Sequence, residues 1–285
     1  MLNNNIETFI GCDAPYEEAS IVLFGAPFDS TTSYRPGTRF GSKAIRGESF
    51  GLETYSPYQD ADLTDAHIFD SGDLELCFGD PAAALGQIQE RTQIILGDGK
   101  LPVMLGGEHL VTLGAVRAAV QRYPDLHIIH FDAHADLRDD YLGASLSHAC
   151  VIRRCWDLMG DGRIFQFGIR SGDRSEFLWG ARGHVRTQKF SFDGLSDLLE
   201  ALHGKPIYFT LDLDVLDPSG FPGTGTPEAG GVTFPQLLDA VLTVCQRGHI
   251  VGCDVNELSP VYDPSGISTA TACKIVRELL LALSN

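Results

Sequence analysis

LHIIHFDAHAD, residues 126–136, decides both the fold and the chemistry of this chain. Its first half is an apolar run of strand length, and its second half places Asp132, His134 and Asp136 at alternate positions. In an extended chain, alternate side chains share one face about 6.6 Å apart, so these three polar groups can converge on one point. The two alanines between them leave room for this. The segment therefore predicts a buried strand that delivers metal-ligating side chains at its carboxyl end.

Two other apolar runs end in side chains of the same kinds. IYFTL at 207–211 leads to Asp212 and Asp214, and VML at 103–105 leads through GGE to His109. Four carboxylates and two imidazoles at three strand ends would be destabilising without cations, because like charges a few ångströms apart cannot all stay ionised. Two divalent ions, about 3.5–4 Å apart, would remove this conflict and could activate water at neutral pH.

The predicted site is therefore a binuclear metal centre. Its mixture of oxygen and imidazole ligands without a thiolate favours two Mn²⁺ ions per chain, with Co²⁺, Ni²⁺, Fe²⁺ and Zn²⁺ as alternatives. His127 and His130 lie within the strand itself, where packing and an internal hydrogen bond are the predicted roles.

Outward from these motifs, apolar runs of strand length alternate with amphipathic runs of helix length. This pattern is typical of a parallel sheet covered by helices on both faces. The predicted strands are Ile21–Pro27, Ala66–Ser71, Leu101–Leu105, Leu126–Asp132, Arg163–Gly168, His184–Thr187, Pro206–Asp212 and His249–Asn256. The predicted helices lie near Pro81–Leu96, Leu110–Arg122, His148–Met159, Gly194–Leu202, Phe234–Arg247 and Ser268–Leu283. We expect an α/β fold with one three-layer domain over residues 1–285.

Two long segments, Asp29–Tyr58 and Val215–Gly231, fit no core element. Loops of this length in a compact domain usually serve a site or an interface. In open parallel sheets such loops and their ligands gather at the carboxyl ends of the strands. We therefore expect both segments near the metal centre.

The composition excludes several classes of protein. The 285 residues are 44% hydrophobic and 21% charged, which suits a globular fold, and the net charge of −17 disfavours nucleic acid and anionic membranes. No apolar stretch reaches the roughly 20 residues of a membrane span, and the polar start Met1–Glu7 does not resemble a secretion signal. Seven scattered cysteines without a C-x-x-C pair are expected to be mostly buried hydrophobes. A cytoplasmic location is expected.

Several long motifs resemble those of the ureohydrolase family, which includes arginase, agmatinase and guanidino-acid hydrolases. They are GGEH at 106–109, DAHAD at 132–136, DLDVLDPSGFPGTGTPEAGG at 212–231, RPGTRFG at 35–41 and DVNELSP at 254–260. The resemblance spans nearly the whole chain. It implies an arginase-like α/β/α domain with an eight-stranded parallel sheet, two Mn²⁺ ions, and hydrolysis of a guanidinium group to an amine and urea. It also implies homotrimers or homohexamers.

The resemblance further implies how the six ligands divide between the ions. One ion would take His109, Asp132, Asp136 and Asp212, and the other Asp132, His134, Asp212 and Asp214, so Asp132 and Asp212 would bridge. His148 matches the proton-shuttling histidine of the family, and Glu257 matches the carboxylate that receives the guanidinium. From the residues alone, His148 could instead be a surface histidine at a helix start, and Glu257 a solvated carboxylate.

Three residues depart from the usual family pattern. Thr210 stands where Ser or Ala is more common, Ser42 follows Gly41 where Pro is frequent, and Asn256 replaces an apolar residue beside Glu257. The floor of the guanidinium pocket is therefore expected to differ slightly.

The loop at 137–148 bears on the substrate. It lacks the Asn- and Ser-rich pattern with which arginases hold the amino-acid end of arginine, and it resembles an agmatinase loop. This resemblance implies the conversion of agmatine to putrescine and urea, a step of polyamine biosynthesis. Asp139 and Asp140 in the loop could favour a cationic tail, or could form an exposed turn.

Other functions stay open at this point. Rival substrates are arginine, guanidinobutyrate, another guanidino acid, formiminoglutamate and guanidine itself. A catalytically silent, metal-binding member of the family is a second class of alternative, disfavoured by the intact ligand set. A deacetylase on a related fold is disfavoured by the GTGTP segment at 223–227 and by Glu257.

Overall fold

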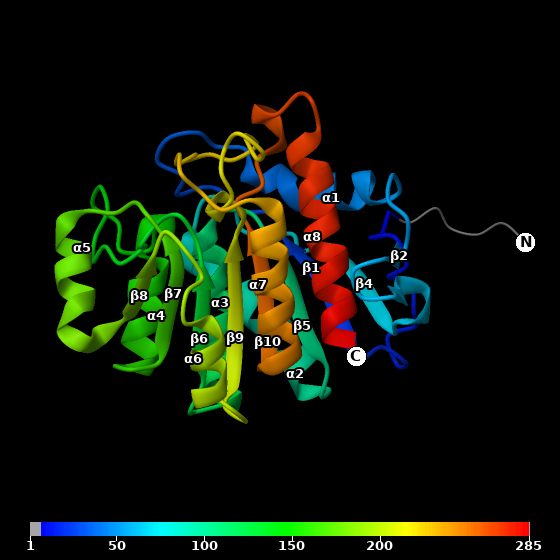
Figure 1. Ribbon diagram of the computed structural model, residues 1–285, viewed down its shortest axis with the longest axis horizontal. Helices are drawn as coiled ribbons and strands as arrows, with labels where there is room; N and C mark the ends of the chain where they lie inside the picture. Colours follow the sequence, from blue (N-terminus) through cyan, green and yellow to red (C-terminus); the bar gives the residue numbers. More distant parts are fainter. Residues whose placement is uncertain (1–6, 285) are drawn as a thin grey trace, which may run out of the picture.

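The computed structural model describes residues 7–284, so most of the polar start Met1–Glu7 lies outside the described residues. Eight strands form one parallel sheet in the order β4-β1-β5-β10-β9-β6-β7-β8 (Figure 1). Their bounds are β1 Ile21–Ala26, β4 Ile68–Asp73, β5 Leu101–Gly106, β6 His127–Phe131, β7 Ile164–Ile169, β8 Arg186–Lys189, β9 Pro206–Asp212 and β10 His249–Asn256. The predicted eight-stranded parallel sheet is confirmed, with each strand within a residue or two of its expected place.

Helices cover both faces of the sheet. One face carries α1 Gly41–Ser49, α6 Leu195–Ala201, α7 Phe234–Arg247 and α8 Ile267–Ser284, which pack side by side. The other carries α2 Pro81–Gly97, α3 Thr112–Arg122 and α4 Val151–Met159. The short α5, Arg174–Trp179, lies beyond β8 at one end of the sheet (Figure 1). The three-layer α/β/α architecture is therefore confirmed.

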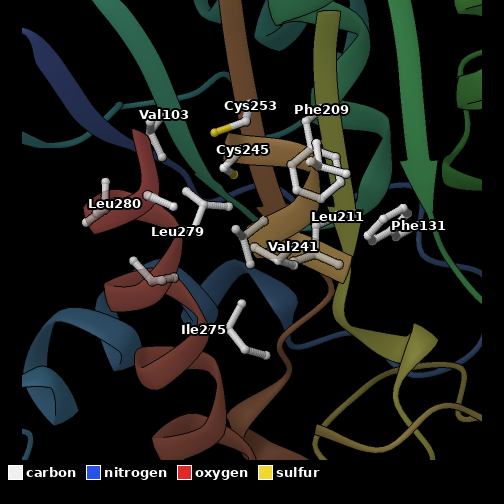
Figure 2. Close-up of a cluster of buried hydrophobic side chains, with 14 of the residues drawn as sticks. Val103, Phe131, Phe209, Leu211, Val241, Cys245, Cys253, Ile275, Leu279 and Leu280 are labelled. Atoms are coloured by element: carbon white, nitrogen blue, oxygen red, sulfur yellow. The ribbon is translucent and has the colours of Figure 1, made fainter. Parts of the chain in front are cut away.

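Each face of the sheet has its own apolar core, because successive strand residues point to opposite faces. Figure 2 shows the core on the α7–α8 side, where Phe209 and Leu211 of β9 lie with Phe131 of β6, Val241 and Leu279. Each such side chain contributes roughly 1.5–3 kcal/mol by leaving water. The intervening strand residues face α2, α3 and α4, and it is this second face that leads to the predicted metal ligands.

The segment Asp29–Tyr58 is not wholly a loop, and here the sequence analysis was wrong. It contains α1, which packs against α8. Ile45 is the one large apolar residue on the buried face of α1, so a helical hydrophobic period is missing from the sequence. Next to Ile45 on this buried face lies a charged residue, Arg46, where an apolar side chain would be expected. Its guanidinium binds the carboxylates of Asp70 and Asp73.

The loops at the carboxyl ends of the strands gather at the top of Figure 1, where the segment Val215–Gly231 lies as expected. All seven cysteines are free, and all except Cys77 are buried, as their scattered spacing predicted. Within residues 7–284, each helix is too short or too polar to serve as a membrane span.

Candidate metal centre and substrate cavity

The carboxylate of Asp132, at the end of β6, faces two histidines at once. Its Oδ2 lies 3.0 Å from Nδ1 of His109, and its Oδ1 lies 3.4 Å from Nδ1 of His134. The backbone N–H of His134 also donates to Oδ1, at 2.5 Å, which fixes the carboxylate plane. Asp132 is completely buried. Its two oxygens therefore point toward two separate groups of possible ligands.

The other predicted ligands complete these two groups. Around Nδ1 of His109 lie Oδ2 of Asp136 at 3.1 Å and Oδ2 of Asp212 at 3.4 Å. Oδ2 of Asp214 lies 3.0 Å from Nδ1 of His134. The structure thus brings all six predicted side chains together, from the ends of β5, β6 and β9.

Two residues here have a backbone conformation that is unusual for side chains with a Cβ atom. Asp136 has a φ of 52° and Glu257 a φ of 65°, both in the left-handed region. This conformation costs on the order of 1 kcal/mol or more for residues other than glycine, and it persists where the surrounding structure requires it. At both positions it aims a carboxylate into the same buried cluster.

The electrostatics of the cluster fit divalent cations. Burial and then the charge of Asp132 raise the pKa of Asp136 to about 7, and burial with Asp214 and Asp132 raises the pKa of Asp212 well above its usual value. Burial alone would lower the pKa of His109, but its hydrogen bonds with Asp132 and Asp136 outweigh burial and raise it. The cluster holds more negative charge than the protein itself neutralises, and its oxygen and imidazole donors suit a metal pair.

Glu257 lies deep beside the cluster. Its Oε1 accepts a hydrogen bond of 2.7 Å from the backbone N–H of His109, and its own N–H donates to Gly107. Burial and the charges of Asp214 and Glu108 raise the pKa of Glu257 well above its usual value. This buried carboxylate therefore favours a positively charged neighbour.

His148 lies at the entrance to the cluster rather than on the outer surface. Its Nε2 is 3.1 Å from Oγ of Ser33, and its backbone N–H donates to Oγ1 of Thr31 at 3.0 Å. Burial and then the neighbouring His134 lower the pKa of His148 to about 4. The imidazole is therefore neutral at physiological pH.

A cavity of about 350 Å³ opens beside this entrance. Its walls include the predicted metal ligands His134 and Asp136 together with Ser33, Arg138, Tyr141, His148, Asp173 and Glu176. The space is large enough for a short linear substrate.

Asp139 and Asp140 do not line this cavity, so of the two roles left open by the sequence the structure supports the exposed turn and not contact with the substrate tail. Asp139 is 74% exposed and pairs with Arg154 at 2.6 Å. Asp140 accepts the backbone N–H of Gly143 in an exposed turn. Besides the predicted ligand Asp136, the acidic groups that line the cavity are Asp173 and Glu176, from the segment that begins α5.

The sequence profile of the Arginase family matches residues 19–282. This chain belongs to the arginase family. It is 47% identical to the agmatinase of Bacillus subtilis, with 96% of each chain covered. It is 38% identical to N(1)-aminopropylagmatine ureohydrolase of Thermococcus kodakarensis, and the match covers 89% of this chain and 88% of the relative. A protein of known crystal structure from Clostridium difficile is 50% identical, with a TM-score of 0.92 and coverage of 95% and 99%.

Some residues of this arginase-family site were not found by sequence reasoning. Thr31 and Ser33 hold His148, and Glu108 in turn accepts hydrogen bonds from Thr31 and Thr32. The loop that carries Thr31 and Ser33 was expected near the site, but the identity of its contacts depends on tertiary folding. The only local signal for Glu108 was its position beside His109.

Proposed function

We propose that this chain hydrolyses agmatine to putrescine and urea at a pair of Mn²⁺ ions. The observation that carries the proposal is the convergence of six ligand side chains, with Asp132 facing both histidines, beside a cavity in a chain 47% identical to an agmatinase. The family resemblance supports a homotrimer or homohexamer, which light scattering of the purified protein would test, and the lack of a predicted membrane span or secretion signal in the sequence supports a cytoplasmic location.

His109, Asp132, Asp136 and Asp212 would hold one ion, and Asp132, His134, Asp212 and Asp214 the other. When bound, the metal pair would supply activation of water and stabilisation of the negative charge that develops during attack. The two oxygens of Asp132 face different histidines, which supports its assignment as a bridging ligand.

Glu257 and His148 would complete the chemistry. Glu257 would bind and orient the guanidinium through charge-assisted hydrogen bonds, so that its carbon faces the attacking water. His148 would take up a proton at Nε2 and transfer it to the leaving amine, because its neutral imidazole lies at the cavity wall. Ser33, 3.1 Å from Nε2, would keep the ring in that position.

The charge of the cavity favours a cationic tail over an anionic one. Outside the proposed ligands, its charged walls are Arg138, Asp173 and Glu176, which gives a formal balance of 1 − 2 = −1. Arg138 is offset by Glu176, whose Oε2 lies 3.6 Å from its Nε. Agmatine ends in an ammonium group, whereas arginine and guanidinobutyrate carry a carboxylate that would need new partners.

We therefore expect kcat/KM for agmatine to exceed that for arginine and for 4-guanidinobutyrate by at least about tenfold, because the cavity repels an anionic tail. Urea release with Mn²⁺ present measures this, and N(1)-aminopropylagmatine extends the panel to a longer cation. Equal or faster turnover of arginine or guanidinobutyrate would contradict the agmatine assignment while leaving the metal centre intact.

Glu257→Gln is expected to lower kcat/KM by about 30-fold, because the amide keeps the shape but loses the charge that binds the guanidinium, a loss of about 2 kcal/mol. Steady-state urea release and elemental analysis for metal are the measurements. Asp139→Asn is the matched control, since it neutralises a carboxylate outside the cavity. Unchanged kinetics in Glu257→Gln would remove this residue from the site.

A further inference from the structure

Buried polar side chains cross the sheet just before the metal cluster. Neighbouring strands contribute one member each in parallel register, and we call them the polar row: Thr187, Gln166, His130, Thr210 and Asp254. All except Thr187 are completely buried. Buried polar side chains need hydrogen-bond partners, and the partners of these residues show which atoms donate and which accept.

Gln166 determines which nitrogen of His130 carries the hydrogen. Its Nε2 donates to the carbonyl oxygen of Ala135 at 2.6 Å, and a carbonyl can only accept, so the orientation of the amide is fixed. The hydroxyl of Thr187 donates to Oε1 on the other side, at 2.9 Å. The same Nε2 lies 3.0 Å from Nδ1 of His130. Nδ1 must therefore accept, and the hydrogen of the neutral ring sits on Nε2.

His130 in turn holds Asp132. Its Nε2 lies 2.8 Å from Oδ2 of Asp132, so the ring donates to the carboxylate that faces both histidines of the metal cluster. His130, His109 and Asp132 lie close enough together to be read as three metal ligands. Both nitrogens of His130 are already engaged, which excludes it as a ligand and makes it a support for Asp132.

The second half of the row acts on His109. The hydroxyl of Thr210 donates to Oδ1 of Asp254 at 2.6 Å, so its oxygen accepts from Nε2 of His109 at 2.9 Å. Nε2 of His109 therefore carries a hydrogen, and Nδ1 is the nitrogen that faces the carboxylates of the cluster and would bind a metal ion. Asp254 is itself held by Tyr208 and Asn256, each at 2.6 Å.

We propose that the polar row positions two ligands of the metal centre, Asp132 through Gln166 and His130, and His109 through Thr210 and Asp254. This inference rests on the proposed metal centre, but none of these four supporting residues is one of the proposed ligands or lines the cavity. Partners that orient the ligands of a metal commonly change its affinity by 10- to 100-fold when removed.

A pair of substitutions at Thr210 separates hydrogen bonding from packing. Thr210→Val keeps the shape and loses the hydroxyl, whereas Thr210→Ser loses a methyl group and keeps the hydroxyl. Calorimetric titration of EDTA-stripped protein with Mn²⁺ alone is expected to give 10- to 100-fold weaker binding for Thr210→Val and near wild-type binding for Thr210→Ser. A role in packing alone would give the opposite order.

Gln166→Met tests the other half of the row, and about tenfold weaker Mn²⁺ binding is expected. Thr92→Val is the control, because this buried hydroxyl on α2 bonds only the carbonyl of Ile88. Melting curves of the stripped variants show whether each one folds. If Thr210→Val and Gln166→Met both bind Mn²⁺ with wild-type affinity, the role of the polar row is overturned and the metal centre stands. If the wild type itself binds no Mn²⁺, the proposed metal centre is overturned as well.

Discussion

Asp132→Ala is expected to reduce urea release to the level of a metal-stripped sample and to leave the chain unable to hold two ions. The reason is that its two oxygens face His109 and His134 separately, so one substitution weakens both groups of ligands. Loss of a partner that only orients a ligand already costs 10- to 100-fold in metal affinity, so loss of a shared ligand should exceed about 100-fold. Asp136→Ala, which faces only the His109 group, should cost less.

Elemental analysis and melting curves with and without EDTA distinguish this effect from misfolding. A ligand present at 100 times its Kd stabilises the folded state by about 2.7 kcal/mol, so EDTA should lower the Tm of the wild type and leave Asp132→Ala nearly unchanged. Asp139→Ala, at an exposed position, is the matched control. Equal metal content in the wild type and Asp132→Ala would contradict the bridging assignment.

The sequence alone indicated where the predicted ligands lie because their positions follow from local rules. Alternation along an extended strand puts Asp132, His134 and Asp136 within reach of one point, and parallel strands end at the same edge of the sheet. Alternation likewise places Asp212 and Asp214 on one face, and His109 follows the end of its own strand after two glycines. None of these arguments depends on which strands are neighbours.

Features that depend on strand order and loop direction could not be predicted in this way. The polar row exists because β6 lies between β7 and β9. This strand order places His130 beside Gln166 and Thr210, which come from distant parts of the sequence. The side chain of Asp139 turns away from the cavity because Arg154, on α4, is its partner. The sequence shows that this loop is acidic. The direction of each acidic side chain depends on contacts with other elements of the fold, which the loop sequence does not reveal.

His148→Asn is expected to lower kcat by roughly 10²- to 10⁴-fold, the usual contribution of a positioned proton-transfer group. The imidazole is neutral at physiological pH, since burial and His134 lower its pKa to about 4, and a ring with this pKa releases an acquired proton readily to the leaving nitrogen. Asparagine keeps a polar group near Ser33 but cannot carry a proton in this way. The effect should fall mainly on kcat, because Glu257 and the cavity walls would still bind the substrate.

The interpretation of this result depends on showing that the metal centre survives. His148 is not one of the proposed ligands, so Mn²⁺ content and affinity should match the wild type in the same sample. His127→Asn is the control, because His127 lies at the opposite end of β6, where loss of a ring should leave kcat unchanged. Added imidazole should restore part of the rate in a smaller variant, His148→Ala, if the lost function is proton transfer. A His148→Asn variant with full kcat would reduce this histidine to a structural role and require another proton donor for the leaving amine.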